Sequence, residues 1–128
     1  MTKHSAACDL KSRESLFIDP GCTAKVPVGV WIEGVNWDLV PMGQIPELQV
    51  RARSGLAFKH SIMLANGVGT VDADYQDEIC VLLYNGGKER FTVEAGMRVA
   101  QMAMNLVHRL DSLDIGEARK GGFGSTKS

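Results

Sequence analysis

The sequence predicts an all-β fold, a sandwich or barrel of short strands with one short helix. Apolar and polar residues alternate along several segments of strand length, and turn-forming residues separate these segments. The clearest turn signals are Asp19-Pro20-Gly21, Asn85-Gly86-Gly87 and Glu94-Ala95-Gly96. The 128 residues are 45% hydrophobic and contain no linker or internal repeat, which indicates one domain with a modest core.

Three segments show the alternation of half-buried strands. Their predicted buried faces consist of Val26, Val28, Val30 and Ile32; of Leu48, Val50 and Ala52; and of Ala100, Met102, Met104 and Leu106. Residues 78–84 are almost continuously apolar, which favours a strand buried on both faces. The helix is expected to begin near Ser54, a favourable N-cap, and to last one or two turns because Gly55 weakens it. Its apolar positions are Leu56, Met63 and Leu64.

Charge and cysteine content exclude several classes of protein. Fourteen basic and fifteen acidic residues leave no net field that would attract nucleic acid or an anionic membrane. Cys8, Cys22 and Cys80 lack C-x-x-C spacing and predict reduced thiols, packed as small apolar side chains. No apolar stretch reaches the length of a membrane span, and the N-terminus lacks the apolar region of a signal peptide. We therefore expect a cytoplasmic protein that binds neither nucleic acid nor membrane.

Two short stretches carry groups suited to chemistry. Asp72 and Asp74, two positions apart, form an acid/base or metal pair, or else are solvated acids of a turn. Arg53, Ser54 and Gly55 offer a guanidinium, a hydroxyl and backbone N–H groups at a strand-to-helix junction, where an anion could bind. The three histidines are dispersed and predict no metal site built from protein ligands.

The C-terminal residues 116–128 have the composition of a frayed end. A Walker phosphate loop is excluded, because there the lysine precedes the hydroxyl residue at the start of a helix. Phe123 is unusual in such a tail, since an exposed ring gains nothing from solvent. Its position between glycines favours a ring that stacks on a flat ligand.

Five motifs in a fixed order resemble those of the trimeric deoxyuridine triphosphate nucleotidohydrolases, the dUTPases. They are AACDLKS, RARSGLAFKH, NGVGTVDADYQDE, GMRVAQM and RKGGFGST, and they span nearly the whole chain. The resemblance implies a β jelly-roll in residues 1–115, a flexible arm in residues 116–128 that closes over the active site, and a homotrimer with shared active sites. It also implies hydrolysis of dUTP to dUMP and pyrophosphate.

The resemblance gives each matched residue a role. Asp72 matches the carboxylate that activates the water attacking the α-phosphorus, a role that needs an ionised acceptor. Tyr75 matches the ring that lies against the deoxyribose and rejects a 2′-hydroxyl. Asn66 matches the residue that reads uracil, together with the backbone from Asn66 to Tyr75. The further substrate contacts implied are Gly69, Thr70 and Val71 in this segment, and Arg53, Ser54, Gly55 and Gln101, which neighbouring subunits supply for the phosphates.

The arm and the metal complete the implied site. The matched arm residues are Phe123 over uracil, and Gly124, Ser125 and Thr126 over the phosphates. Arg119 is the candidate for the basic ligand of the arm, one position closer to Gly-Gly than the family's usual arginine. Mg²⁺ is expected to arrive with the triphosphate, because it prefers oxygen ligands and often binds through phosphates. Asp9 either holds a metal-bound water from the outer shell or caps nearby backbone as a structural acid.

Several positions depart from the family pattern. Ala118 stands where an arginine is usual, and Asp77 and Ala7 stand where glycines are usual. We expect the family's leading strand to be shortened or missing, and the stretch EGVNWDLVPMGQIPEL is longer than the ordinary connection. We expect this stretch to cover the sheet edge that the shortened strand leaves open.

Two other functions are considered beside dUTP hydrolysis. A related dCTP deaminase shares the fold and part of the motifs, but it uses a glutamate where this chain has Leu82 and lacks the Gly-Gly-Phe-Gly arm. A non-catalytic nucleotide-binding or regulatory protein on the same fold is the second. Retention of Asp72, Tyr75 and Gln101 favours the enzyme.

Overall fold

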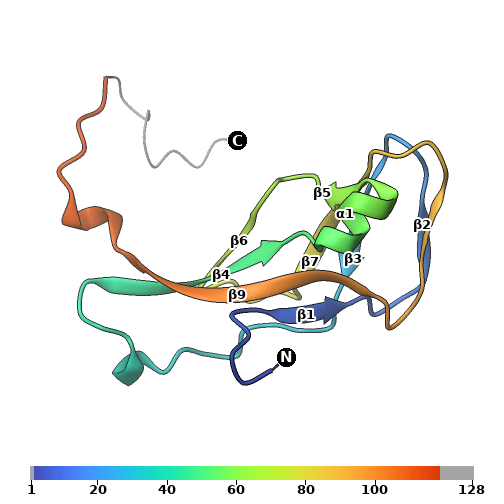
Figure 1. Cartoon of the computed structure of the whole chain (residues 1–128). Coiled ribbons are helices and arrows are strands. Elements are labelled where there is room, and N and C mark those ends of the chain that lie inside the picture. Colours follow the sequence, from blue (N-terminus) through green and yellow to red (C-terminus); the bar gives the residue numbers. More distant parts are fainter. Residues whose placement is uncertain (1, 119–128) are drawn as a thin grey trace.

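The computed structural model describes residues 2–118 and confirms a mostly β chain with one short helix (Figure 1). The strands are β1 Cys8–Lys11, β2 Leu16–Ile18, β3 Thr23–Pro27, β4 Gln44–Arg51, β5 Ile62–Leu64, β6 Gly69–Asp72, β7 Cys80–Asn85, β8 Phe91–Val93 and β9 Arg98–His108. The α-helix α1 spans Ser54–His60, and two 3₁₀ helices span Trp37–Leu39 (η1) and Leu110–Ser112 (η2). None of the helices in residues 2–118 is long and apolar enough to cross a membrane.

The strands pair in antiparallel order in three small sheets. One sheet has the order β1-β9-β4-β6, a second the order β3-β7-β5, and β2 pairs with β8. The long strand β9 lies between β1 and β4 and runs the length of the molecule in Figure 1. In the described part of the chain the sheets are open, and they close into no barrel. This leaves β5 and β6 as edge strands of two different sheets.

The core fills the space between these sheets. The deeply buried side chains include Val26, Ile62, Val81 and Leu83 from one sheet, and Leu10, Val50, Val99 and Ala100 from the other. One polar side chain, Asn85, is fully buried among them and is well bonded. Its amide donates to the carbonyls of Ile18 and Glu89 at 2.8 Å, and its Oδ1 accepts from the Gly87 N–H at 2.9 Å. Asn85 therefore fixes the β7–β8 turn against β2, and the polar atoms of its buried side chain all have hydrogen-bond partners.

The helix and the following strand differ from the prediction in detail. Ser54 is the first helical residue, and the N-cap is Arg53, which makes no side-chain cap bond. The helix ends at Ser61, whose φ of 55° turns the chain sharply. Met63 therefore lies in β5 and not in the helix, because a left-handed residue breaks the helical path before it.

Two predicted strand faces also differ. β3 ends at Pro27, because Gly29 adopts a φ of 70° and turns the chain away, so Val30 is exposed. Along β9, Ala100 is fully buried but Met104 is 62% exposed, because the strand extends beyond the core. The thiols are free, but Cys22 is exposed and not packed as predicted.

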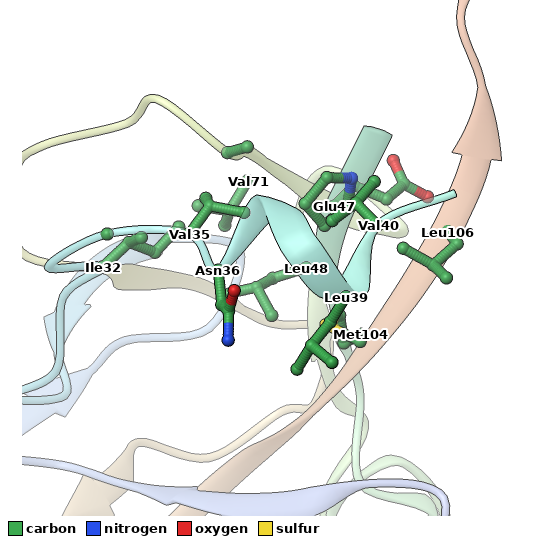
Figure 2. Close-up of a pocket in the computed structure, with 13 residues that line it drawn as sticks. Ile32, Val35, Asn36, Leu39, Val40, Glu47, Leu48, Val71, Met104 and Leu106 are labelled. Atoms are coloured by element: carbon green, nitrogen blue, oxygen red, sulfur yellow. The ribbon is translucent and has the colours of Figure 1, made fainter. Parts of the chain in front are cut away.

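The long connection between β3 and β4 was predicted to cover a sheet edge and instead lies over a sheet face. Its residues Ile32, Val35 and Leu39 line a cavity of about 360 Å³ together with Leu48 and Met104 (Figure 2). Leu48 is in register with Met104 of β9 and with Val71 of β6, so these side chains share one face of the sheet. The connection thus covers part of an apolar face and leaves Met104 largely exposed.

Candidate active site

The β5–β6 segment, residues 62–72, joins two sheets, and its two strands do not pair with each other as a hairpin would. Its first strand, β5, pairs with β7, whereas its second strand, β6, pairs with β4. A tight turn connects them, in which the Gly67 N–H bonds the Leu64 carbonyl at 3.0 Å and the Val68 N–H bonds the Asn66 carbonyl at 2.8 Å. In the described structure each strand keeps one backbone edge without a strand partner. The β5–β6 segment therefore offers free backbone donors and acceptors to a ligand.

Asn66 and Gly69 lie against each other in this segment. A Cβ atom built on Gly69 would stand 3.3 Å from the Asn66 Nδ2 and 3.3 Å from the Val50 Cβ. A side chain at this position would therefore crowd the Asn66 amide, which lies against the strand at Gly69. Further along β6, Thr70 is exposed, whereas the Val71 side chain faces the cavity under the β3–β4 connection. Val71 can reach a nucleotide in the segment only through its backbone.

Asp72 and Tyr75 are held by one turn. Asp72 is the last residue of β6, opposite Glu47 of β4, and its carbonyl accepts the N–H of Tyr75 at 3.1 Å. Asp72 and Asp74 are both exposed, and among the described residues neither carboxylate is engaged in a hydrogen bond or ion pair. The Asp72 carboxylate is thus available as an acceptor at the end of the β5–β6 segment, and Tyr75 follows it by three residues.

The predicted residues Asp9, Arg53 and Gln101 gather at the other end of β4 with Arg98, which is not among the predicted site residues. We call these four residues the arginine cluster. The Asp9 carboxylate lies 3.8 Å from Arg53 Nε and 3.7 Å from Arg98 Nε. Arg53 also donates to the Arg98 carbonyl at 3.3 Å, and Gln101 donates to the Ala52 carbonyl at 3.0 Å. Since two guanidinium groups share one carboxylate, the cluster carries an excess of positive charge that suits an anion.

Ser54 and Gly55 adjoin the cluster as the first two residues of α1. N–H groups in the first turn of a helix have no partner within the helix, and both residues are exposed. The helix is short, so its contribution to anion binding depends on the neighbouring guanidinium groups.

The structure brings together each group of predicted residues but keeps the two groups apart. Asp72 lies opposite Glu47, whereas Arg53 follows Glu47 by six residues along an extended chain. At the rise of a β-strand this separation is roughly 20 Å. The first group comprises Asn66, Gly69, Thr70, Val71, Asp72 and Tyr75; the second comprises Asp9, Arg53, Ser54, Gly55 and Gln101.

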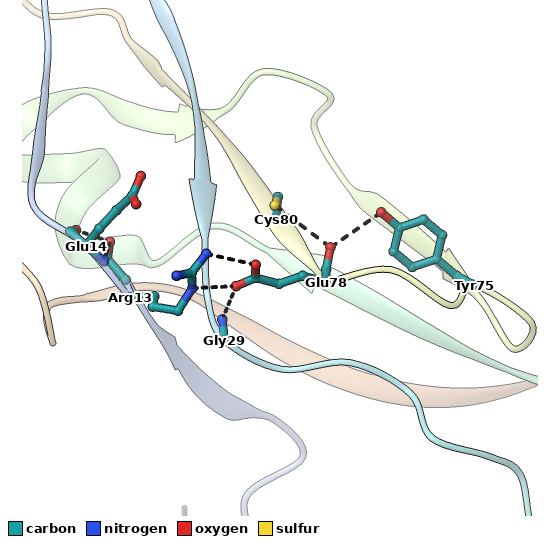
Figure 3. Close-up of polar contacts among 7 residues, drawn as sticks. Arg13, Glu14, Gly29, Tyr75, Glu78 and Cys80 are labelled. Carbon is teal, nitrogen blue, oxygen red and sulfur yellow. Dashed lines mark hydrogen bonds and ion pairs between the residues drawn. The ribbon is translucent and has the colours of Figure 1, made fainter.

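An ion pair that the sequence gave no reason to predict lies beside Tyr75. Arg13 donates from Nε and Nη2 to the two carboxylate oxygens of Glu78, at 2.9 and 3.0 Å, and the Gly29 N–H donates to the same group at 2.8 Å (Figure 3). The Arg13 guanidinium, followed by the Gly29 N–H, holds the pKa of Glu78 below its usual value, and Glu78 raises the pKa of Arg13. Arg13 and Glu78 are 65 positions apart, so no local pattern could reveal the pair.

A second open cavity, of about 380 Å³, lies beside Tyr75. Asp74 and Tyr75 line it on one side, and Val35 and Trp37 of the β3–β4 connection line it on the other. The apolar cavity of Figure 2 is lined by only one of the predicted site residues, Val71. No described cavity joins the β5–β6 segment to the arginine cluster.

Several predicted features lie outside what the structure describes or tests. Arg119, Phe123, Gly124, Ser125 and Thr126 lie outside the described residues. Residues 2–118 contain no group of three or more His, Cys, Asp or Glu side chains placed to hold a metal ion. Asp77, which replaces a usual glycine, adopts an ordinary backbone conformation, because Ser61 is the single non-glycine residue of positive φ in the described chain.

Comparison with known proteins gives a consistent result. The sequence model of the dUTPase family matches residues 1–127. The chain is 46% identical to the deoxyuridine 5'-triphosphate nucleotidohydrolase of Rhizobium meliloti (strain 1021), over 98% of this chain and 79% of that protein. It is 39% identical to the protein of the same name from Rickettsia canadensis (strain McKiel), over 98% of this chain and 84% of that protein.

Solved structures agree with the sequence comparison. A crystal structure of dUTPase from Streptococcus mutans superimposes with a TM-score of 0.73 at 29% identity, covering 86% of this chain and 84% of that chain. A mutant dUTPase from phage phi11 of S. aureus, in which the coordination of a structural Mg(II) ion was described, shares the fold with a TM-score of 0.73. Its identity is 16%, over 91% of this chain and 87% of that chain.

Proposed function

The chain belongs to the dUTPase family and hydrolyses dUTP to dUMP and pyrophosphate, and we propose that Asp72 is the base of this reaction. The Asp72 carboxylate takes a proton from a water molecule, whose oxygen attacks the α-phosphorus in line with the bond to the β-phosphate. That bond breaks, and pyrophosphate leaves. The observation that carries this proposal is the single turn that holds Asp72 beside Tyr75, with Tyr75 N bonded to Asp72 O at 3.1 Å.

Uracil recognition follows from the edges of β5 and β6. The Watson–Crick edge of uracil presents two carbonyl oxygens and one N–H, which a peptide backbone edge can pair with donors and an acceptor. We assign the base to the space beside the β5–β6 segment, where Asn66, Gly69, Thr70 and the backbone of Val71 contact it. The Asn66 side-chain amide both donates and accepts, so it can pair with a uracil carbonyl and the neighbouring N–H. Cytosine carries an amino group where uracil carries a carbonyl, so a protein donor placed for uracil would face another donor.

Tyr75 is assigned to the sugar. Its ring is 39% exposed beside an open cavity, so one face remains available to a ligand. A ring carbon against C2′ leaves a 2′-hydroxyl without a hydrogen-bond partner, so a ribonucleotide loses the energy of that buried hydroxyl. Tyr75 thereby excludes UTP.

The phosphates are assigned to the arginine cluster of a neighbouring subunit. Phosphate ligands must lie within a few ångströms of the α-phosphorus, whereas Arg53 of the same chain is roughly 20 Å from Asp72 along the strand. A homotrimer in which one chain supplies Asp72 and another supplies Arg53, Ser54, Gly55 and Gln101 resolves this separation. In the arm, Arg119, Phe123, Gly124, Ser125 and Thr126 are proposed to complete the site, with Phe123 over uracil.

Mg²⁺ is proposed to enter with the triphosphate. Asp9 alone makes no cage, and its carboxylate is already shared by Arg53 and Arg98, so it fits a role as acceptor for a metal-bound water better than direct ligation. When bound, the ion would neutralise charge on the phosphate oxygens. The structural Mg(II) of the phage phi11 protein supports an ion in this fold. Cytoplasmic location stays a prediction from the sequence.

One assay tests the function. Pyrophosphate release is measured with dUTP, dCTP, dTTP and UTP at equal concentrations, and ammonia is measured with dCTP. We expect release with dUTP and little with the other three. Ammonia from dCTP would instead indicate a deaminase, which is disfavoured because the apolar Leu82 lies in β7 where the deaminase has its glutamate. No turnover with any nucleotide, together with tight dUTP binding, would indicate a regulatory protein.

A further inference from the structure

We propose that Glu78 is a positioning residue that sets how strongly this enzyme prefers deoxyribose to ribose, by anchoring the segment that carries Tyr75. The inference rests on the proposed role of Tyr75 as the wall against C2′. Glu78 contacts no substrate in this scheme and acts through Tyr75. The argument depends on how few contacts hold residues 75–78 and on how firmly Glu78 is held.

The segment from Tyr75 to Glu78 has no regular structure and is held at its two ends. At one end the Tyr75 N–H bonds the Asp72 carbonyl at 3.1 Å. Between the ends, Gln76 and Asp77 are exposed and make no hydrogen bond within the described residues. At the other end Ile79 is buried and bonds the Val30 carbonyl at 2.9 Å. A segment with so few bonds moves readily unless the residue before Ile79 is also held by its side chain.

Glu78 is that residue, and two distant parts of the chain meet at its carboxylate. Arg13 comes from the loop between β1 and β2, and Gly29 comes from the turn after β3. The Arg13 backbone is itself fixed, since its N–H bonds the Pro27 carbonyl at 2.8 Å. Gly29 has a φ of 70°, a conformation that favours glycine, and this turn directs its N–H at the Glu78 carboxylate. Three bonds, two of them in the bidentate geometry, make a well-oriented anchor.

The anchor reaches the ring of Tyr75 through the backbone of Glu78. The Tyr75 hydroxyl lies 3.4 Å from the Glu78 carbonyl, a long contact that supports the far end of the ring (Figure 3). The Glu78 carbonyl shares a peptide plane with the Ile79 N–H and stays bonded through it, so loss of the Glu78 carboxylate frees the part of the segment before this plane, residues 75–77 with the ring of Tyr75. Because rejection of a hydroxyl depends on close contact with the ring, a small displacement is enough to admit a ribose. The Asp72 turn lies at the opposite end and is less affected.

The test compares the ratio of kcat/KM for dUTP to kcat/KM for UTP among variants. In Glu78→Ala and in Arg13→Ala we expect this ratio to fall about tenfold, chiefly because UTP becomes a better substrate. The double variant should fall no further, since both changes remove the same contact. Glu78→Gln keeps an acceptor for Arg13 and Gly29 and should retain most of the preference. Glu94→Ala, at an exposed turn glutamate, is the matched control and should leave the ratio unchanged.

The ratio separates positioning from stability. A variant that is only less folded loses activity on dUTP and UTP equally, so its ratio stays constant even when its melting temperature falls. Tyr75→Ala serves as the reference. An unchanged ratio in Glu78→Ala, beside a lowered ratio in Tyr75→Ala, would overturn the role of Glu78 alone. An unchanged ratio in Tyr75→Ala would overturn the sugar wall and this inference together. If Glu78→Ala does not fold, Arg13→Lys replaces it in the test. Arg13→Lys keeps the positive charge but loses the bidentate contact, so a lowered ratio supports the proposal and an unchanged ratio overturns it.

Discussion

The residues proposed for base and sugar follow one another along the chain, from Asn66 in the β5–β6 segment to Tyr75 just after it, whereas the arginine cluster gathers side chains from β1, β9 and the start of α1. Local backbone bonds of one chain position this first region, among them Val68 N–H to Asn66 O and Tyr75 N–H to Asp72 O. The second has two guanidinium groups for one carboxylate and lies roughly 20 Å from Asp72. This difference underlies our proposal that one chain selects the nucleoside while another chain holds its phosphates.

Replacement of Asp72 tests the first region and has the largest expected effect on turnover. Asp72→Asn keeps the shape of the turn but removes the ionised acceptor, so turnover should fall by roughly 10²-fold or more while nucleotide binding persists. Asp74→Asn is the matched control, since Asp74 is an exposed carboxylate of the same turn. Single-turnover rates and equilibrium binding of dUTP separate chemistry from affinity. Equal losses in the two variants would contradict the assignment of Asp72.

Mixed trimers test the division between the two regions. Asp72→Asn and Arg53→Ala should each inactivate the homotrimer, the latter because loss of a charge-stabilising donor costs roughly 10²-fold or more. When the two variants are unfolded together and refolded at equal amounts, roughly a quarter of the sites should combine a native Asp72 with a native Arg53 from another chain. Activity should therefore return towards that fraction. No recovery from a mixture that has demonstrably exchanged subunits would place both residues in one chain's site.

Gly69→Ala sharpens the description of the first region with a smaller effect. The added methyl group would crowd Asn66 Nδ2 and Val50 Cβ, both 3.3 Å from its position. Because the Asn66 amide can swing aside but Val50 cannot, KM for dUTP should rise about fivefold with a modest loss of stability and little change in kcat. Gly34→Ala, whose Cβ would meet no atom within 4 Å, is the control. A rise in KM in both variants would remove the special role of Gly69.

The smallest expected effect is a loss of stability at acid pH, which tests the contact of Glu78 with Arg13 and Gly29. The pKa of Glu78 is lowered from its ordinary 4.5 by hydrogen bonds from Arg13 and Gly29, so folding is stabilised by this group above about pH 4.5 and loses that contribution as pH falls through the lowered value. Arg13 stays protonated throughout, and Glu14 and Cys80 are the other titratable groups near it. The difference in urea midpoint between the native protein and Glu78→Gln should therefore shrink in acid. If the difference in urea midpoint stayed the same at every pH, the charge of the Glu78 carboxylate would not contribute to stability.

Sequence patterns predicted the parts of the molecule that depend on neighbours along the chain. The alternation around Val50 gave β4, the apolar run before Tyr84 gave β7, and the motif order gave the family. The pairing of β5 with β7 and of β6 with β4 was not predictable, because it depends on contacts such as Ile62 with Asn85 that join distant parts of the chain. The exposure of Met104 has the same cause, since periodicity shows which side chains share a face but not what covers that face.

Two strands with free backbone edges also carry a risk of self-association. An unpaired edge can add a strand from another molecule as readily as it accepts a base, and this is a common route to aggregation. Here β5 has only three residues and β6 only four, and the Asn66-Gly67 turn separates them. Edges this short give a foreign strand few bonds, which limits self-association. In the proposed binding mode the base occupies the same edges, so bound nucleotide should also suppress precipitation during storage.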